Sequence, residues 1–149
     1  MEVTRPTRKL TAMAAHEAVR AAVSRAEELG VAVNVSIVDA GGREIAFLRG
    51  DGAFLPSGQI ARDKAYTAVG FGMPTGDFYR ALSGKPDVLS GITGQPHVAA
   101  FPGGLPIRSD GELIGGIGVS GASAEQDDIC AKAGLAAIGL VTGPEQEQG

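Results

Sequence analysis

Residues 103–121 read Gly-Gly-Leu-Pro-Ile-Arg-Ser-Asp-Gly-Glu-Leu-Ile-Gly-Gly-Ile-Gly-Val-Ser-Gly, and this stretch decides the fold. The central Ser-Asp-Gly is turn chemistry, so the stretch predicts a β-hairpin. Strand alternation places Ile114, Gly116, Gly118 and Ser120 on one face of the second strand, so only two of these four residues carry a side chain. Because glycine weakens a strand, such a bare face indicates the close approach of a helix backbone, a neighbouring subunit or a flat ligand.

Helical periodicity, capping residues and strand alternation assign the rest of the chain. We expect helices over residues 12–29, 58–70, 77–82 and from about 124 to 140. Strands are expected over residues 31–38 and 43–49, with a short one near 98–101, whereas residues 83–97 are expected to form a loop. Because the strands come as hairpins, the sheet is predicted to be antiparallel and the fold class α+β.

The chain of 149 residues is long enough for one domain with a real core. Residues 1–10 are expected to form a flexible N-terminal arm, and residues 11–141 a single domain. Gly143-Pro144 is expected to stop the last helix, and the acidic residues 142–149 are expected to be a disordered tail.

Composition excludes several functional classes. The formal net charge is −4 and no basic run is present, which argues against binding to nucleic acid. No apolar run is long enough to span a membrane and no signal-like segment follows the polar N-terminus, so we expect a cytoplasmic protein. Cys130 is the single cysteine, which excludes an intramolecular disulfide, and its apolar helical setting predicts a buried thiol.

Six short motifs occur in a characteristic order along the chain. They are Val38-Asp39-Ala40-Gly41-Gly42, Arg49-x-Asp51-Gly52-Ala53, Ile60-Ala61 with Lys64-Ala65 and Thr67-Ala68, Gly103-Gly104-x-Pro106-Ile107, Gly118-Val119-Ser120-Gly121, and Gln126-Asp127. Together they resemble the GlcG/HbpS family, often described as haem-binding or haem-degrading proteins. The resemblance covers the chain from about Leu10 to Leu140.

The resemblance implies a five-stranded antiparallel sheet flanked by helices, like the profilin or PAS-type sensor fold. It also implies assembly into dimers or larger symmetric homo-oligomers. Haem or a related tetrapyrrole is the candidate cofactor, although relatives range from proteins of glycolate and diol operons to extracellular haem sensors and a domain joined to a cobalamin adenosyltransferase. The fold is therefore implied more specifically than the function.

Lys64 is the first candidate functional residue because it interrupts the apolar face of the second predicted helix. It could hold an anionic ligand, such as a carboxylate or a haem propionate, or act in catalysis. The alternative is a structural lysine that extends past the core to pair with Asp63 or Asp51.

Arg49 and Asp51 lie at the end of the second predicted strand and are expected on one face. They are either an ion pair that fixes the strand end, or an anion-binding arginine beside a catalytic carboxylate. Gly103, Gly104 and Ser120 of the hairpin are further ligand-binding candidates, for which helix packing against the sheet is the alternative. We expect Arg49, Asp51 and the Gly-Gly turn to converge with Lys64 on one cavity.

The two histidines have different expected roles. His16 lies at the edge of the apolar stripe of the first helix, where it is either a half-buried structural residue or a ligand to haem iron. The second role is implied by the resemblance, in which a histidine of the first helix is associated with haem. His97, in the irregular segment before the hairpin, is a candidate general acid or base at the cavity rim.

Three functions therefore remain open from the sequence. The first is a small oligomeric protein that binds haem through His16, with Lys64 or Arg49 at the propionates. The second is a cofactor-free lyase, isomerase or cyclase that acts on a small organic acid or carbonyl compound, with His97 or Asp51 moving a proton. The third is an accessory assembly protein without a ligand.

Overall fold

A computed structural model describes residues 1–140 of the chain. The elements in chain order are α1 Ala12–Glu28, β1 Asn34–Asp39, β2 Glu44–Arg49, α2 Leu55–Phe71, α3 Thr75–Leu82, α4 Pro86–Thr93, β3 Gly104–Ser109, β4 Glu112–Ser120 and α5 Ala124–Ala137. The strands form one sheet in the order β2-β1-β4-β3, and every neighbouring pair is antiparallel. The predicted α+β class is confirmed, whereas the predicted tail lies outside the described residues.

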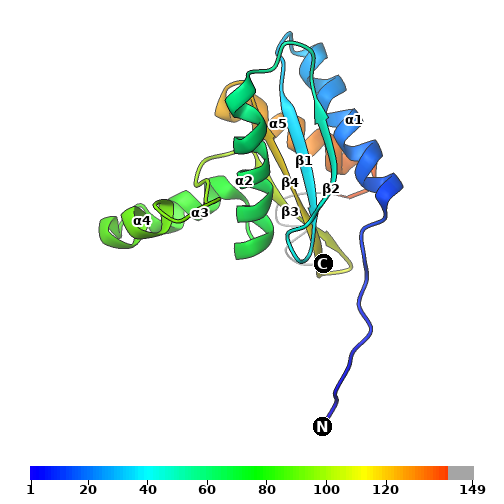
Figure 1. Ribbon diagram of the computed structural model, residues 1–149, viewed down its shortest axis with the longest axis vertical. Helices are drawn as coiled ribbons and strands as arrows, with labels where there is room; N and C mark the ends of the chain where they lie inside the picture. Colours follow the sequence, from blue (N-terminus) through cyan, green and yellow to red (C-terminus); the bar gives the residue numbers. More distant parts are fainter. Residues whose placement is uncertain (141–149) are drawn as a thin grey trace.

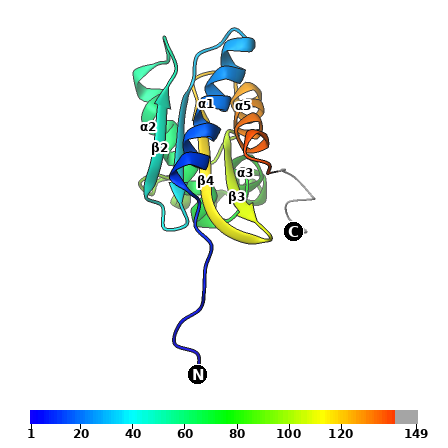
Figure 2. The same ribbon diagram turned by 90° about the vertical axis from the view of Figure 1, so that its right-hand side faces the viewer.

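Helices cover both faces of the sheet. Helix α2 packs on one face, and α1 and α5 pack together on the other (Figure 1, Figure 2). Helices α3 and α4 extend to one side of this three-layer body, at the left of Figure 1. The two central strands, β1 and β4, are therefore buried between helices, whereas the edge strand β2 is only partly covered.

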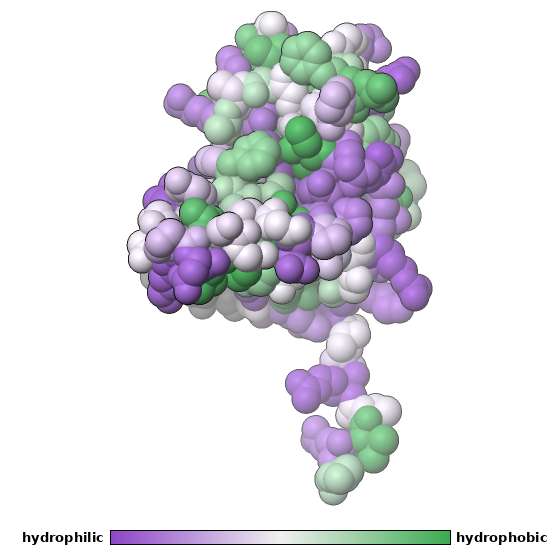
Figure 3. All heavy atoms as spheres, turned by 60° about the vertical axis from the view of Figure 1, so that its left-hand side comes forward, coloured by the Kyte–Doolittle hydropathy of each residue, from purple (hydrophilic) through white to green (hydrophobic). Residues whose placement is uncertain are grey.

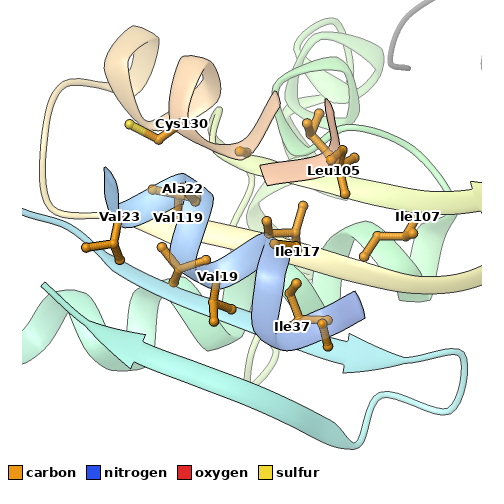
Figure 4. Packing of buried hydrophobic residues seen from close by; sticks show 14 of the residues in the cluster. Val19, Ala22, Val23, Ile37, Leu105, Ile107, Ile117, Val119 and Cys130 are labelled. Carbon is orange, nitrogen blue, oxygen red and sulfur yellow. The ribbon is translucent and has the colours of Figure 1, made fainter. Parts of the chain in front are cut away.

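The main core lies between the sheet and the α1–α5 layer. Ile37, Ile107, Ile117 and Val119 point from the strands into this layer and are fully buried, as Figure 4 shows. The buried side chains that α1 contributes are mostly small: Ala15, Ala18, Val19, Ala22, Val23 and Ala26. These small side chains let α1 lie close to the strands. Each buried isoleucine or valine of the core adds about 1.5–3 kcal/mol to the free energy of unfolding.

The bare face of β4 is explained by the backbone of α2. A Cβ atom on Gly118 would lie 2.0 Å from the carbonyl oxygen of Ala61, and one on Gly116 would lie 2.5 Å from that of Ala65. Of the three expected neighbours of this face, the structure therefore shows the helix. The space over these glycines is filled, which excludes a flat ligand there.

The predicted face of Ile114 is wrong. Ile107 pairs with Gly115 whereas Arg108 pairs with Leu113, so Ile114 is the extra residue of a β-bulge. A bulge shifts the alternation by one position. Ile114 therefore packs into the α1 side of the sheet, and Leu113 packs on the α2 side.

The sheet has four strands within residues 1–140, not the five implied by the resemblance. Residues 98–101 form no strand, because side-chain hydroxyls occupy their backbone groups. The Thr67 hydroxyl accepts a hydrogen bond from the Ala99 N–H, and the Thr75 hydroxyl donates to the Phe101 carbonyl. Assignment to the profilin or PAS type stays a prediction.

Several helix bounds differ from expectation, and α3 begins at Thr75 rather than at residue 77. Helix α4 occupies part of the predicted loop, and its signals are Pro86 and Asp87 in the first turn. Helix α2 begins three residues early, because Pro56 suits a first turn and the Ser57 hydroxyl donates to the Phe54 carbonyl inside that turn. Helix α5 ends at Ala137, and Gly139 just beyond it has a left-handed backbone with φ of 81°.

Residues 1–10 contain no helix or strand. The last residues of this segment contact the folded domain. The Arg8 N–H donates a hydrogen bond to the Glu112 carboxylate of the hairpin, and Leu10 packs against the core. Flexibility of this arm stays a prediction. Within residues 1–140, no helix combines the length and apolar character needed to cross a bilayer.

Candidate functional site

Lys64 is completely buried on α2. Its Nζ donates to the Val119 carbonyl at 2.9 Å and to Asp127 Oδ2 at 3.0 Å, and it lies 4.5 Å from the centre of the Phe101 ring. The ammonium group is thus enclosed by partners from β4, α5 and the segment before β3. The sequence predicted Asp63 or Asp51 as the partner of Lys64, and this prediction is wrong.

Asp127 is the partner that sequence reasoning missed. It lies in the first turn of α5, is 3% exposed, and its Oδ1 accepts a hydrogen bond from the Ala122 N–H. Burial lowers the pKa of Lys64 and raises the pKa of Asp127, while the attraction between the two charges opposes both shifts. The signal in the sequence was an acid directly after the capping box that begins with Ser123.

Gly103 and Gly104 do lie beside Lys64, as the sequence predicted. A Cβ atom on Gly103 would lie 2.7 Å from Lys64 Nζ, and one on Gly104 would lie 2.5 Å from the Lys64 carbonyl oxygen. Gly103 also has φ of 126°, a conformation that side chains disfavour. The two glycines therefore let the chain pass directly over the lysine, which leaves little room for a ligand between them.

Arg49 and Asp51 are not part of this cluster. Arg49 ends the edge strand β2, and Gly104 begins the opposite edge strand β3, with β1 and β4 between them. Three strand spacings of roughly 4.8 Å separate the two edges by about 14 Å. Both residues are exposed, and no ion pair joins them within the described chain. Ser120 is buried opposite Asn34.

His97 belongs to a different pocket. Its Nδ1 lies 3.0 Å from Asp63 Oδ1, and its ring meets the edge of Tyr66 with 5.7 Å between ring centres. These residues line a pocket of about 280 Å³ on the α2 side of the sheet. The sequence suggested His97 but missed Asp63 and Tyr66 as its neighbours, although the two are one turn apart on α2.

His16 is exposed on α1, so it is not the half-buried structural residue that one interpretation expected. Ala12, one turn earlier on the same face, lines a cavity of about 450 Å³. The lining of this cavity includes the basic residues Arg8 and Lys9 and the apolar residues Leu10, Ile45, Leu113 and Ile114. The acids Asp39 and Glu112 also line this cavity, and His16 itself is not among the lining residues.

The helix-flanked antiparallel sheet defines a class of small α+β domains. Within residues 1–140, no group of acids, histidines and cysteine is arranged to hold a metal ion by itself. The family model described as "Haem degrading protein HbpS-like" matches residues 10–136, and this chain belongs to that family.

The chain is similar to two curated proteins. It is 40% identical over 139 residues to the corrinoid adenosyltransferase PduO of Citrobacter freundii, covering 92% of this chain and 41% of that protein. The chain thus spans about two fifths of that relative. It is also 35% identical over 127 residues to an uncharacterised 15.0 kDa protein from the dhaT–dhaS intergenic region of the same organism, covering 85% of this chain and 89% of that protein.

Three crystal structures are similar over nearly their whole length. A PduOC–haem complex has 41% identity and a TM-score of 0.82, covering 89% of this chain and 96% of that one. A Streptomyces reticuli HbpS double mutant has 38% identity and a TM-score of 0.83, with 92% of each chain covered. Klebsiella pneumoniae ORFY has 32% identity and a TM-score of 0.86, covering 95% of this chain and 99% of that one.

Proposed function

We propose that this protein binds haem in the cavity between the N-terminal arm, α1 and the β3–β4 hairpin. The observation that carries the proposal is the 41% identity to a chain crystallised as a haem complex. The cavity supports it, because about 450 Å³ lies within the roughly 300–1,000 Å³ typical of ligand sites.

The residues around the cavity have chemistry that fits haem. Leu10 and Ile114 supply apolar surface for the macrocycle, and Lys9 supplies positive charge for a propionate. Arg8 pairs with Asp110 and Glu112, so it would have to leave these acids to bind a propionate. His16 is our candidate iron ligand, because its exposed imidazole lies one turn beyond Ala12 of the cavity wall. Bound haem would supply an iron centre that takes axial ligands, and the residues named here would bind and orient it.

A titration with haemin tests this function. Increasing haemin is added to the purified protein and the Soret absorbance is followed against a buffer blank. We expect a shifted Soret band that saturates at a fixed ratio of haemin to subunit. A response that rises without saturation and matches bovine serum albumin would contradict specific binding.

A homo-oligomer and a cytoplasmic location complete the proposal. The exposed aromatic and aliphatic side chains include Phe54, Leu55, Phe71, Tyr79 and Phe101. Figure 3 shows hydrophobic residues, in green, among hydrophilic ones on one face of the molecule. Burial of such groups between subunits would stabilise a small chain with few large core residues. The buried Cys130 is free, which suits a reducing compartment.

A further inference from the structure

We infer that the polar pocket lined by Asp63, Tyr66 and His97 is a second site, in which His97 transfers a proton to and from a small uncharged hydroxycarbonyl compound. This inference is independent of haem binding. The pocket lies on the α2 side of the sheet, whereas the cavity proposed for haem lies by the arm, α1 and the hairpin.

The His97 ring is held in a defined orientation. Asp63 Oδ1 lies 3.0 Å from Nδ1, and because a carboxylate only accepts, the neutral ring carries its proton on Nδ1 and has its free lone pair on Nε2. The backbone is fixed as well, since the Thr67 hydroxyl donates to the His97 carbonyl. His97 has a left-handed backbone with φ of 68°, which non-glycine residues other than asparagine, aspartate and histidine seldom adopt. Nε2 is therefore positioned as a general base.

The charges of the lining disfavour an anion. The Arg62 Nε donates to Glu44 at 3.0 Å, and the guanidinium lies 4.1 Å from the centre of the Phe47 ring. Arg62 is thus already neutralised, and the carboxylate of Asp63 leaves the lining with a net negative charge. The small organic acid considered from the sequence is therefore a poor ligand for this pocket, and a neutral carbonyl compound is a better one.

The size and polarity of the pocket narrow the ligand further. A volume of about 280 Å³ falls just below the roughly 300–1,000 Å³ of sites for drug-sized ligands, so a compound of a few carbon atoms fits and a tetrapyrrole does not. The Ser36 hydroxyl donates to Glu44 Oε1, and Gln59 Nε2 donates to Asp63 Oδ1. The second carboxylate oxygens of Glu44 and Asp63 are left as acceptors for ligand hydroxyl groups in the pocket. A short hydroxycarbonyl compound matches this lining.

The reaction requires no oxidant or cofactor. His97 Nε2 takes a proton from the carbon beside the carbonyl, and the electron pair of that C–H bond forms the C=C bond of an enediol. The carbonyl oxygen receives the proton of the Tyr66 hydroxyl, a group with no hydrogen-bond partner within residues 1–140. Return of both protons regenerates the compound or its isomer, so exchange of the carbon-bound hydrogen with solvent reports the step.

The test is deuterium exchange into hydroxyacetone in heavy water, followed by proton NMR with haem-free protein. We expect the wild type to accelerate exchange at its hydroxymethylene group at least tenfold over buffer. His97→Asn, which tolerates the left-handed backbone, should return the rate to that of buffer. Tyr66→Phe should lower the rate, whereas Tyr79→Phe, a matched control with 47% exposure against 45% for Tyr66, should leave it unchanged.

Circular dichroism checks that each variant is folded. If His97→Asn is unfolded, the comparison of the exchange rates of Tyr66→Phe and Tyr79→Phe tests the inference instead. A wild-type rate no faster than buffer would overturn the inference, as would equal rates for wild type and His97→Asn or for the two tyrosine variants. Haemin titration of the same preparations is a separate readout, so failure here is distinguishable from failure of haem binding.

Discussion

Lys64 Nζ and Asp127 Oδ2 lie 3.0 Å apart and join helices that cover opposite faces of the sheet. Neither side chain is more than 4% exposed. The Val119 carbonyl completes the contact from β4, one of the two central strands of the sheet. Because both charges are buried, each depends on the other, and this pair is expected to fix α2, β4 and α5 relative to one another.

Removal of the lysine charge should destabilise the fold. Lys64→Met leaves the Asp127 carboxylate buried without its partner, and we expect the free energy of unfolding to fall by about 3–5 kcal/mol in urea titrations. Lys132→Met is the matched control, because Lys132 is exposed and pairs with Asp128 on the surface. This variant should lower the free energy of unfolding by less than about 1 kcal/mol.

The double variant Lys64→Met/Asp127→Leu should recover most of that loss, since it removes both charges. A Lys64→Met protein as stable as the Lys132→Met control would contradict a structural role. If that variant also lost ligand binding, Lys64 would be a ligand residue after all.

Gly118 should tolerate no side chain. Gly118→Ala places a methyl group 2.0 Å from the Ala61 carbonyl oxygen, so α2 must move away from β4. We expect a loss of at least about 1–3 kcal/mol in unfolding free energy, as for other overpacked sites. Gly91→Ala on α4 has open space around it and should be neutral or stabilising by up to about 1 kcal/mol. Equal stability of the two variants would show that the sheet and α2 are not in close contact.

Cys130 should be unreactive in the native protein. Burial raises the pKa of its thiol from 9.0 to about 11, so little thiolate forms at pH 8. Because the folded protein holds this proton more tightly, the associated stability is present below pH 9 and is lost as the pH rises towards 11. Labelling with Ellman's reagent at pH 8 should be slow in buffer and complete in urea. Rapid labelling of folded protein would place the thiol at the surface.

The protein should be larger than one subunit in solution. Multi-angle light scattering at micromolar concentration should give a mass that is a multiple of 15.1 kDa. The exposed aromatic and aliphatic side chains would be partly covered in such an assembly. A mass of one subunit across that concentration range would reject the homo-oligomer.

Local signals in the sequence predicted much of the fold. The capping box at Ser123 and the Asp-Gly turn of the hairpin depend on near neighbours, and each is confirmed. The glycines of β4 indicated a close approach, but the neighbour that makes it, α2, is distant in the sequence. The bulge at Ile114 was not predictable by alternation, because alternation assumes that no residue is inserted. Helix α4 was missed although Pro86 at its start was a usable signal.

The candidate sites were harder to predict than the fold. Lys64 stood out because it interrupts an apolar helix face, but its partner Asp127 is 63 positions away, and no local rule joins the two. Spacing likewise gave no indication that Arg49 and Gly104 lie at opposite edges of the sheet, since strand order is a property of the whole topology. The partners of His97 follow from the same long-range packing.

The most direct test of haem binding in the α1 cavity is the Soret spectrum of His16→Ala. The exposed imidazole of His16 contributes little to packing, so this variant should fold like the wild type. The account predicts that haemin added to His16→Ala loses the shifted Soret band of the wild-type complex, whereas His97→Ala, altered in the other pocket, keeps it. An unchanged Soret position and affinity in His16→Ala would contradict His16 as the iron ligand.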